Sequence, residues 1–262
     1  MAHLVFLDTE VTKLDQPRLV QLSYHASGAK KALTEIFKPA EPISFRAMAE
    51  HGITRQQADQ YLPFDGSASQ AALRDLAATH IFVAHNAAFD AEVLRNEGVE
   101  PKFLLCTMKV AAILAPDVES YNLMSLIYEL GLNDENLGHN PHNADFDRCA
   151  LERLYEHLWG LAAVKWPEKT EKERLYEMVL ISARPMLLRT CYFKKHKNKP
   201  WAQVATEDRS YLEWVAGNAE FDEDMRYTAR FWLDNKSEAA TSAPQPEAEP
   251  KAAPTIGTDL PF

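Results

Sequence analysis

Four carboxylates and one histidine stand in three short motifs within the first 150 residues. Asp8 and Glu10 lie in FLDTE, Asp90 ends HNAAFD, and His142 and Asp147 lie in HNADFD. Carboxylates gathered at one point repel one another, so that such a cluster is tolerated mainly where cations bind between them. A cation site with a histidine beside it is typical of phosphodiester cleavage, because the metal supplies hydroxide and imidazole exchanges a proton near neutral pH.

The spacing of these residues predicts that their side chains share one place. LVFLD is a short apolar run that predicts a buried strand, and in a strand residues i and i+2 face the same side. Asp8 and Glu10 therefore point together. Asp90 opens a helix directly after a second apolar run, HIFVAHN. His142 precedes Asp147 by five residues, which is not quite one helical face, so we expect His142 on the loop before the helix.

A site made of carboxylate oxygens, with few nitrogen ligands, favours Mg²⁺ or Mn²⁺ over zinc. Two such ions about 3.5–4 Å apart can clamp the attacking and leaving oxygens of an in-line displacement. The alternative is a set of separate solvated acids, and a single D-x-E pattern carries little information. Asp8 argues for the metal site, because it ends an apolar strand where an unpaired carboxylate is costly.

The elements that would hold these residues predict an α/β fold with a mixed five-stranded sheet. LVFLD, RLVQLSYHA and KKALTEIFKP have the pattern of an antiparallel meander, and HIFVAHN and FLLCTM add strands that alternate with helices. Helices are expected within 44–53, with Gly52 as the C-cap, from Thr54, at 67–79, 87–98, 109–115, 122–130 and from about Asn143 to Leu158.

The chain divides into three predicted parts. Residues 1–165 form the α/β domain, and residues 166–235 form a small, mostly helical module with a basic segment, with helices near 173–182, 209–217 and 222–235. Residues 236–262 are rich in Ala, Pro, Ser, Thr and Glu without an apolar period, which predicts a disordered linker with a C-terminal peptide.

The three motifs together resemble the DEDDh branch of the DnaQ-like exonuclease superfamily, whose motifs are F-x-D-x-E, H-N-x-x-F-D and H-x-x-x-x-D. The resemblance covers about residues 3–160. It implies a ribonuclease H-like fold and 3′–5′ cleavage at single- or double-stranded DNA ends, releasing nucleoside 5′-monophosphates. The implied metal ligands, for two ions, are Asp8, Glu10, Asp90 and Asp147, and the implied general base is His142.

The same resemblance implies contacts with the substrate. They would come from Thr9 in the first motif and from His85 and Asn86 near the 3′ terminus, with Phe89 packing the site. Leu14 corresponds to a place where an apolar wedge meets a duplex end, although simple packing is an equal alternative. Many members have threonine and glycine after the first motif, whereas this chain has Val11, Thr12 and Lys13, so recognition of the terminal nucleotide is expected to differ.

A basic segment, CYFKKHKNKPW, is the second candidate for contact with DNA. Its lysines are Lys194, Lys195, Lys197 and Lys199. It resembles a module found after such nuclease domains, with the pattern F-G-K-H-K-G-K-P, except that both glycines are replaced. Tyr192, Phe193 and Trp201 could stack on bases. The alternative is a solvated turn whose aromatic residues form the core of the module, and we favour DNA.

The chain ends in TDLPF, which resembles the C-terminal tip of bacterial single-stranded DNA-binding proteins. Asp259, Leu260, Pro261 and Phe262 could dock in an apolar pocket with a basic rim on a protein partner. An inert chain end is a comparable alternative.

The composition of the 262 residues excludes little. The net charge of −10 argues weakly against nucleic acid, because local charge decides binding to a polyanion. No apolar run is long enough for a membrane span, and three scattered cysteines without a leader segment predict a cytoplasmic protein. We expect a nuclease in DNA repair. The alternatives are an exoribonuclease on the same fold and a non-catalytic adaptor that binds DNA and proteins.

Overall fold

The computed structural model of the chain describes residues 3–134, 137 and 140–235. These residues form two compact units, the first ending at Ala183 and the second beginning at Arg184. The predicted C-terminal linker and the peptide Asp259–Phe262 lie outside the described residues. Within the described part of the chain, no helix combines the length and the apolar character that crossing a bilayer requires.

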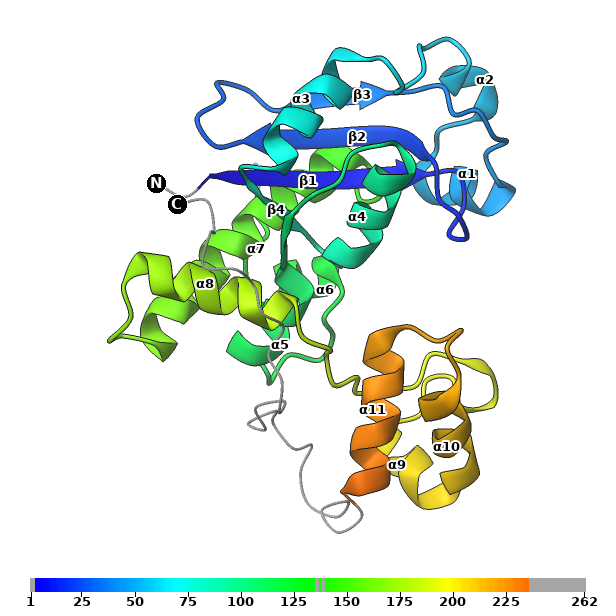
Figure 1. The fold of residues 1–262 in the computed structure, drawn as a ribbon, viewed down its shortest axis with the longest axis vertical. Helices are drawn as coiled ribbons and strands as arrows, with labels where there is room; N and C mark the ends of the chain where they lie inside the picture. The colour runs from blue at the N-terminus through cyan, green and yellow to red at the C-terminus, as the bar shows by residue number, and fades with distance from the viewer. Residues whose placement is uncertain (1–2, 135–136, 138–139, 236–262) are drawn as a thin grey trace. The chain divides into compact units, whose positions relative to one another are not determined.

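The first unit is built on a mixed five-stranded sheet in the order β3-β2-β1-β4-β5 (Figure 1). β1 (Leu4–Val11), β2 (Leu19–Ala26) and β3 (Leu33–Ile36) are antiparallel neighbours, as the meander predicted. β4 (Ile81–Ala84) and β5 (Phe103–Cys106) continue the sheet in parallel with β1. The predicted fold class is confirmed. The strand order makes β1 the central strand of the sheet.

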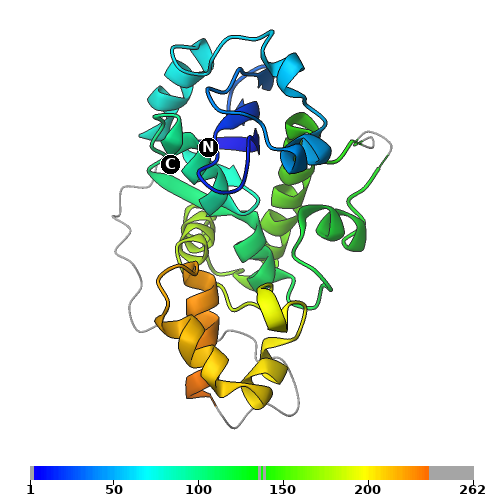
Figure 2. The same ribbon diagram turned by 90° about the vertical axis from the view of Figure 1, so that its right-hand side faces the viewer.

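Helices cover both faces of this sheet (Figures 1 and 2). α3 (Ala68–Ala77) and α4 (Ala87–Asn96) share a core with the face of β1 that carries Val5 and Leu7. The opposite face, with Leu4, packs against four helices. These are α5 (Thr107–Leu114), α6 (Leu123–Glu129), α7 (Ala144–Lys165) and α8 (Glu171–Ser182).

Two short helices lie between β3 and α3. They are α1 (Phe45–His51) and α2 (Arg55–Ala58). α1 is held next to the end of β1, because Ser44 N donates to Thr12 O at 2.9 Å and His51 Nε2 lies 3.3 Å from Val11 O. Gly52 ends α1 with a φ of 73°, which glycine adopts without strain.

The boundary between the units lies later than the sequence suggested. α7 runs to Lys165 rather than Leu158, and α8, which we expected in the C-terminal module, packs on the first unit. Leu175, Met178 and Val179 are buried in the first unit's core. Ser182 Oγ also accepts the backbone N–H of Cys106 at 2.8 Å. The α/β unit is therefore complete only at the end of α8.

The second unit is helical and has a core of its own. The helices expected near 209–217 and 222–235 are present as α10 (Arg209–Gly217) and α11 (Glu223–Asp234). A 3-10 turn, η1 (Lys194–His196), and α9 (Trp201–Glu207) were not predicted. The core includes Cys191, Trp201, Val204, Tyr211, Leu212, Val215, Met225 and Trp232.

Candidate active site

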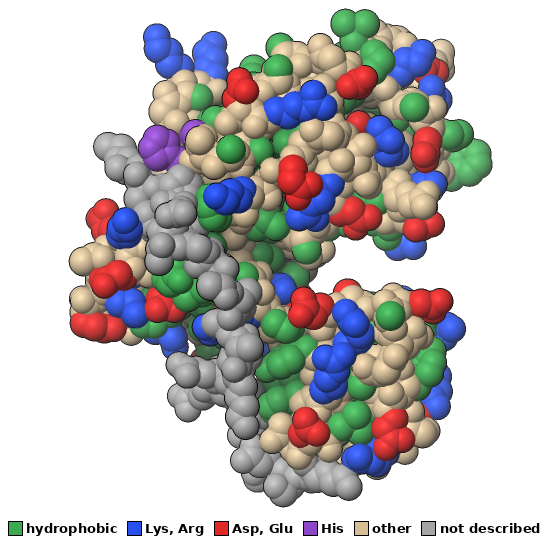
Figure 3. Space-filling model, in the orientation of Figure 1, with side chains coloured by type: hydrophobic (Ala, Val, Ile, Leu, Met, Phe, Trp, Pro, Cys, Tyr) green, Lys and Arg blue, Asp and Glu red, His purple; other side chains and the backbone are tan. Residues whose placement is uncertain are grey.

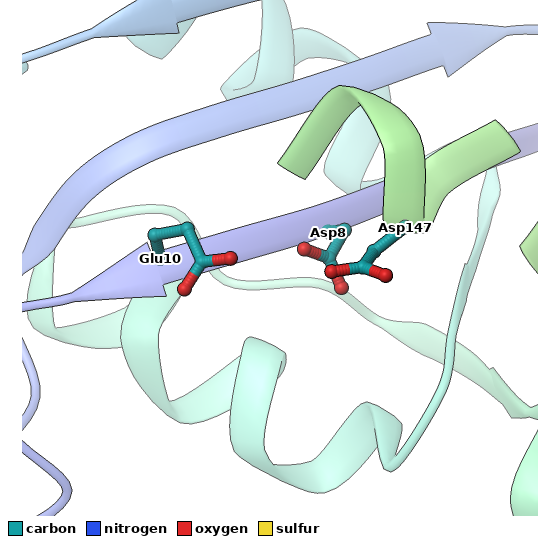
Figure 4. Close-up of side chains that lie close together, drawn as sticks. All are labelled: Asp8, Glu10 and Asp147. Atoms are coloured by element: carbon teal, nitrogen blue, oxygen red, sulfur yellow. The ribbon is translucent and has the colours of Figure 1, made fainter. Parts of the chain in front are cut away.

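Three of the five predicted residues converge at one point of the first unit. Asp8 and Glu10 on β1 and Asp147 on α7 each place one carboxylate oxygen within 4.8 Å of the other two. Figure 4 shows the carboxylates of Asp8 and Asp147 next to each other, with that of Glu10 pointing toward them. We call this set the acidic cluster.

The alternation of β1 and the start of α7 produce this convergence. On β1, Leu4 faces the core that contains α7, and Asp8 and Glu10 follow on the same side of the strand. Asp147 lies in the first turn of α7. That turn is fixed to β2, because the Ala144 N–H donates to Gln21 Oε1 at 3.0 Å in the buried interior. Strand period and helix start therefore bring together residues that are distant in the chain.

Asp90 lies beside the acidic cluster, at the start of α4. Its side chain is buried, and its Oδ1 accepts the Thr9 hydroxyl at 2.8 Å. Thr9 is itself only 8% exposed, so in this structure its hydroxyl holds Asp90 and does not face solvent. Asp90 is close enough to Asp8 to raise the pKa of that carboxyl.

The electrostatics of the four carboxylates are unfavourable without a cation. Burial, followed by repulsion from Asp90, Asp147 and Glu10, raises the pKa of Asp8 well above its usual value. Burial and the neighbouring acids raise the pKa of Glu10 to about 8. Burial also raises the pKa of Asp90 to about 7 and that of Asp147 to about 6. A cluster of oxygen donors that resists ionisation fits a hard divalent cation, which would favour the charged forms.

His142 lies on the loop before α7, as the five-residue spacing predicted. Its backbone has a φ of 63°, and its N–H donates to Asp147 Oδ2 at 2.9 Å. Its imidazole is 54% exposed, and Nε2 lies 3.3 Å from Glu50 Oε1 on α1. The loop thus connects the acidic cluster to α1. Glu50 was missed by sequence reasoning, because no motif marks it.

His85 is a structural link in this protein. Nε2 lies 2.8 Å from the carbonyl of Tyr121, and Nδ1 lies 2.9 Å from Thr107 Oγ1. Burial lowers the pKa of His85 to about 4, so the ring is neutral. A carbonyl only accepts, so Nε2 carries the proton and Nδ1 accepts from the Thr107 hydroxyl. Both ring nitrogens are used, which leaves neither for the nucleotide contact that the resemblance implied.

Asn86 and Phe89 differ in their exposure. Asn86 precedes α4 with a φ of 62°, is exposed, and makes no side-chain hydrogen bond that caps the helix. Its amide is therefore available to a ligand. Phe89 is partly buried against the core on the α4 face, and its role in packing the site stays a prediction.

Leu14 lies in the turn that follows β1. Its side chain is 65% exposed, so the simple packing alternative is wrong for this residue. The turn is closed by a hydrogen bond from Thr12 N to Arg18 O at 2.9 Å. Lys13 in the same turn pairs with Glu41 at 3.3 Å.

The predicted basic segment lies in the second unit, and its residues are not equivalent. Lys195 lies 2.5 Å from Asp208 Oδ2, and Lys199 lies 2.7 Å from Glu207 Oε2. Trp201 has no exposed surface, so the expectation that it stacks on a base is wrong. It faces the core from the first residue of α9.

The chain is similar in sequence to a known exonuclease. The chain is 29% identical over 205 residues to exodeoxyribonuclease 10 of Escherichia coli (strain K12). The aligned residues cover 78% of this chain and 85% of the relative. No protein-family model matches the chain.

Two solved structures share the fold. Exonuclease X in complex with 5′-overhanging duplex DNA is 24% identical with a TM-score of 0.51, over 67% of this chain and 99% of that one. The zinc-bound form of the E. coli ExoI–ssDNA complex is 19% identical with a TM-score of 0.53, over 68% of this chain and 43% of that one. The strand order, the acidic cluster and the curated relative agree with the resemblance seen in the motifs: the chain has the fold of the DnaQ-like 3′–5′ exonucleases and is similar in sequence to an exodeoxyribonuclease.

Proposed function

We propose that this protein is a metal-dependent 3′–5′ exodeoxyribonuclease that releases nucleoside 5′-monophosphates from DNA ends. The observation that carries the proposal is the acidic cluster, in which Asp8, Glu10 and Asp147 approach within 4.8 Å beside Asp90 and His142. DNA as the substrate is supported by the exodeoxyribonuclease to which the chain is similar.

In the proposed mechanism, Asp8, Glu10, Asp90 and Asp147 hold two divalent cations, Mg²⁺ or Mn²⁺. When bound, such cations lower the pKa of water and offset the charge of the phosphate. The imidazole of His142 accepts the proton of the attacking water as its oxygen bonds to phosphorus and the 3′ oxygen of the penultimate nucleotide leaves. Glu50, 3.3 Å from Nε2, stabilises the charged ring.

The end of the DNA would be recognised by the turn after β1 and by the start of α4. Leu14 is exposed four residues beyond Glu10, where an apolar side chain can contact the terminal base pair. Asn86, exposed and without a capping bond, can contact the terminal nucleotide. Thr9 would act by holding Asp90 and not by touching DNA.

The test is digestion of end-labelled single- and double-stranded DNA with Mg²⁺ or with EDTA. We expect mononucleotides from the 3′ end with Mg²⁺ and none with EDTA. Asp8→Ala or Asp147→Ala should abolish cleavage. Asp145→Asn is the matched control, because Asp145 lies on the same helix turn but bonds Arg148 at 3.1 Å. An Asp8→Ala or Asp147→Ala variant that digests DNA at the wild-type rate contradicts the proposal.

Matched RNA oligonucleotides in the same assay separate this proposal from an exoribonuclease. Faster cleavage of RNA would reassign the substrate but not the chemistry. Binding without any cleavage by the wild-type protein would favour the adaptor. The presence of all five residues argues against that outcome, since an adaptor does not need them.

A role in DNA repair, in the cytoplasm, and a protein partner for Asp259–Phe262 remain proposals from the sequence. Binding of the terminal peptide to proteins that recognise single-stranded DNA-binding protein tips would test the last of these. Deletion of Phe262 is the control, because its ring would be a main part of what is recognised. Equal binding of both peptides, or none, contradicts it.

A further inference from the structure

Two residues of the second unit hold a backbone conformation that normally requires glycine. Lys194 has a φ of 45° and Asn198 has a φ of 67°. These are the two positions at which the resembled pattern has glycine, so both turns persist without it. Asparagine tolerates this region better than most residues, but lysine does not. A lysine that holds this backbone conformation at a cost in strain points to a use for its side chain.

The four lysines of the segment fall into two pairs. Lys195 and Lys199 are neutralised by Asp208 and Glu207. Lys194 and Lys197 make no ion pair with any residue that the structure describes. Lys194 Nζ instead lies 4.8 Å from the centre of the Phe193 ring and 5.8 Å from that of Trp214. The charge available to a ligand is therefore concentrated on Lys194 and Lys197.

Trp214 gives this charge an aromatic neighbour. The side chain is 44% exposed, whereas Trp201 and Trp232 in the same unit are buried. Its ring is fixed by contact with Phe221 at 5.0 Å and Tyr211 at 5.6 Å between centroids. A large ring that is held in place but partly open is suited to stacking.

We propose that Lys194, Lys197 and Trp214 form a binding face for single-stranded nucleic acid. A base stacks on Trp214, and Lys194 and Lys197 contact phosphates. The acidic excess of the chain does not lie in this unit, because residues 184–235 hold nine Lys and Arg against eight Asp and Glu, and the charges of Lys194 and Lys197 are complementary to phosphate. Figure 3 shows basic side chains beside hydrophobic ones on this unit. The inference rests on the proposed function in one respect: the bound strand would be the one that is cleaved.

The test is the affinity of the full-length protein for a fluorescein-labelled single-stranded DNA, measured by anisotropy in EDTA so that nothing is cleaved. Lys194→Gly relieves the left-handed strain, so the unit keeps its stability while affinity falls severalfold. The slope of log K against log salt becomes shallower by about 0.7 for one lost phosphate contact. Asn198→Gly relieves the same strain without removing charge, and should bind as wild type.

Two more variants complete the set. Lys199→Ala removes a lysine that is already paired and should bind as wild type. Trp214→Ala should weaken binding, and a thermal melt of this variant shows whether the second unit still folds. If the second unit of Trp214→Ala does not fold, Lys194→Gly alone decides the test. Wild-type affinity in Lys194→Gly overturns the proposal. So do losses of affinity in Asn198→Gly and Lys199→Ala that equal the loss in Lys194→Gly. If the face binds a protein instead, the affinity for DNA is unchanged in every variant, which also overturns it.

Cleavage of a short oligonucleotide separates this inference from the proposed function. Asn198→Gly, which lies outside the binding face, should cleave it with wild-type kinetics, whereas Lys194→Gly should raise the KM. If the wild-type protein cleaves nothing, the proposed function fails while the binding measurement still stands. If Lys194→Gly cleaves and binds as wild type, only the binding face fails.

Discussion

Burial and the neighbouring acids raise the pKa of Glu10 to about 8, so the folded protein binds this proton more tightly than the unfolded chain does. The stabilisation from the proton is complete below the usual glutamate pKa of about 4.3 and is lost as the pH rises toward 8. The metal-free protein is therefore expected to be less stable at pH 8 than at pH 5 on account of the acidic cluster.

Glu10→Gln removes this titration. In EDTA at pH 8 the variant should be more stable than wild type by up to about 4 kcal/mol, whereas at pH 4 the difference should nearly vanish. Cleavage should be lost at both pH values. Thermal melts in EDTA measure the first effect, and Glu100→Gln, an exposed glutamate paired with Arg95, is the control. A variant that melts below wild type at pH 8 would show that Glu10 is not strained by its neighbours.

Removal of the proton acceptor should leave a different signature. His142→Ala is expected to lower kcat by about 10²–10⁴, the usual contribution of a general base. The remaining activity should rise with pH, because hydroxide from solution replaces the base. His157→Ala, on the same segment of chain but within α7, is the control. A pH-independent residual rate would assign His142 to substrate binding.

At the scale of elements, the start of α7 determines where Asp147 and His142 lie. The buried bond from the Ala144 N–H to Gln21 Oε1 fixes this start on β2. Arg148 adds a second tie, since its Nε donates to Ser23 Oγ at 2.9 Å. These contacts explain how a helix end far along the chain is held against the central strands.

Gln21→Leu should cost about 1–3 kcal/mol, because it leaves a buried N–H without a partner. It should also lower kcat, because the first turn of α7 is released from β2. Gln70→Leu is a matched control: Gln70 is equally buried, and its Nε2 donates to Glu97 O at 2.7 Å, away from the acidic cluster. Urea unfolding and kcat of both variants test this, and equal kcat values would contradict a positioning role for Gln21.

The sequence predicted the elements whose signals are local. Short apolar runs marked β1 and β4, and the spacing of His142 and Asp147 placed one on a loop and the other on a helix. The contact of Glu50 with His142 could not be predicted, because it depends on where α1 lies after the sheet has formed. The burial of Trp201 was the alternative that we did not favour, because the lysines before it suggested an exposed segment, whereas in space it is surrounded by the core of the second unit.

At the scale of the whole molecule, the position of α8 decides how the chain can be divided. Leu175, Met178 and Val179 are at most 2% exposed and complete the core around β5 and α5. An amphipathic helix does not reveal from its sequence which core it completes, so the sequence pattern alone places the boundary too early, at residue 165.

Two truncations test the boundary. Residues 1–183 should fold with a cooperative melt and cleave short oligonucleotides, because their core is complete. Residues 1–165 should melt at a much lower temperature or aggregate, since each lost apolar side chain contributed about 1.5–3 kcal/mol. Similar melting of the two fragments would show that α8 is dispensable.

The separation of the acidic residues along the chain also orders the events of its synthesis. Asp8 and Glu10 leave the ribosome first, but Asp147 and the helix that carries it follow only after most of the first unit has been made. No partial chain that ends before α7 can assemble the three carboxylates. A growing chain therefore lacks the three-carboxylate cluster until most of its first unit has been made.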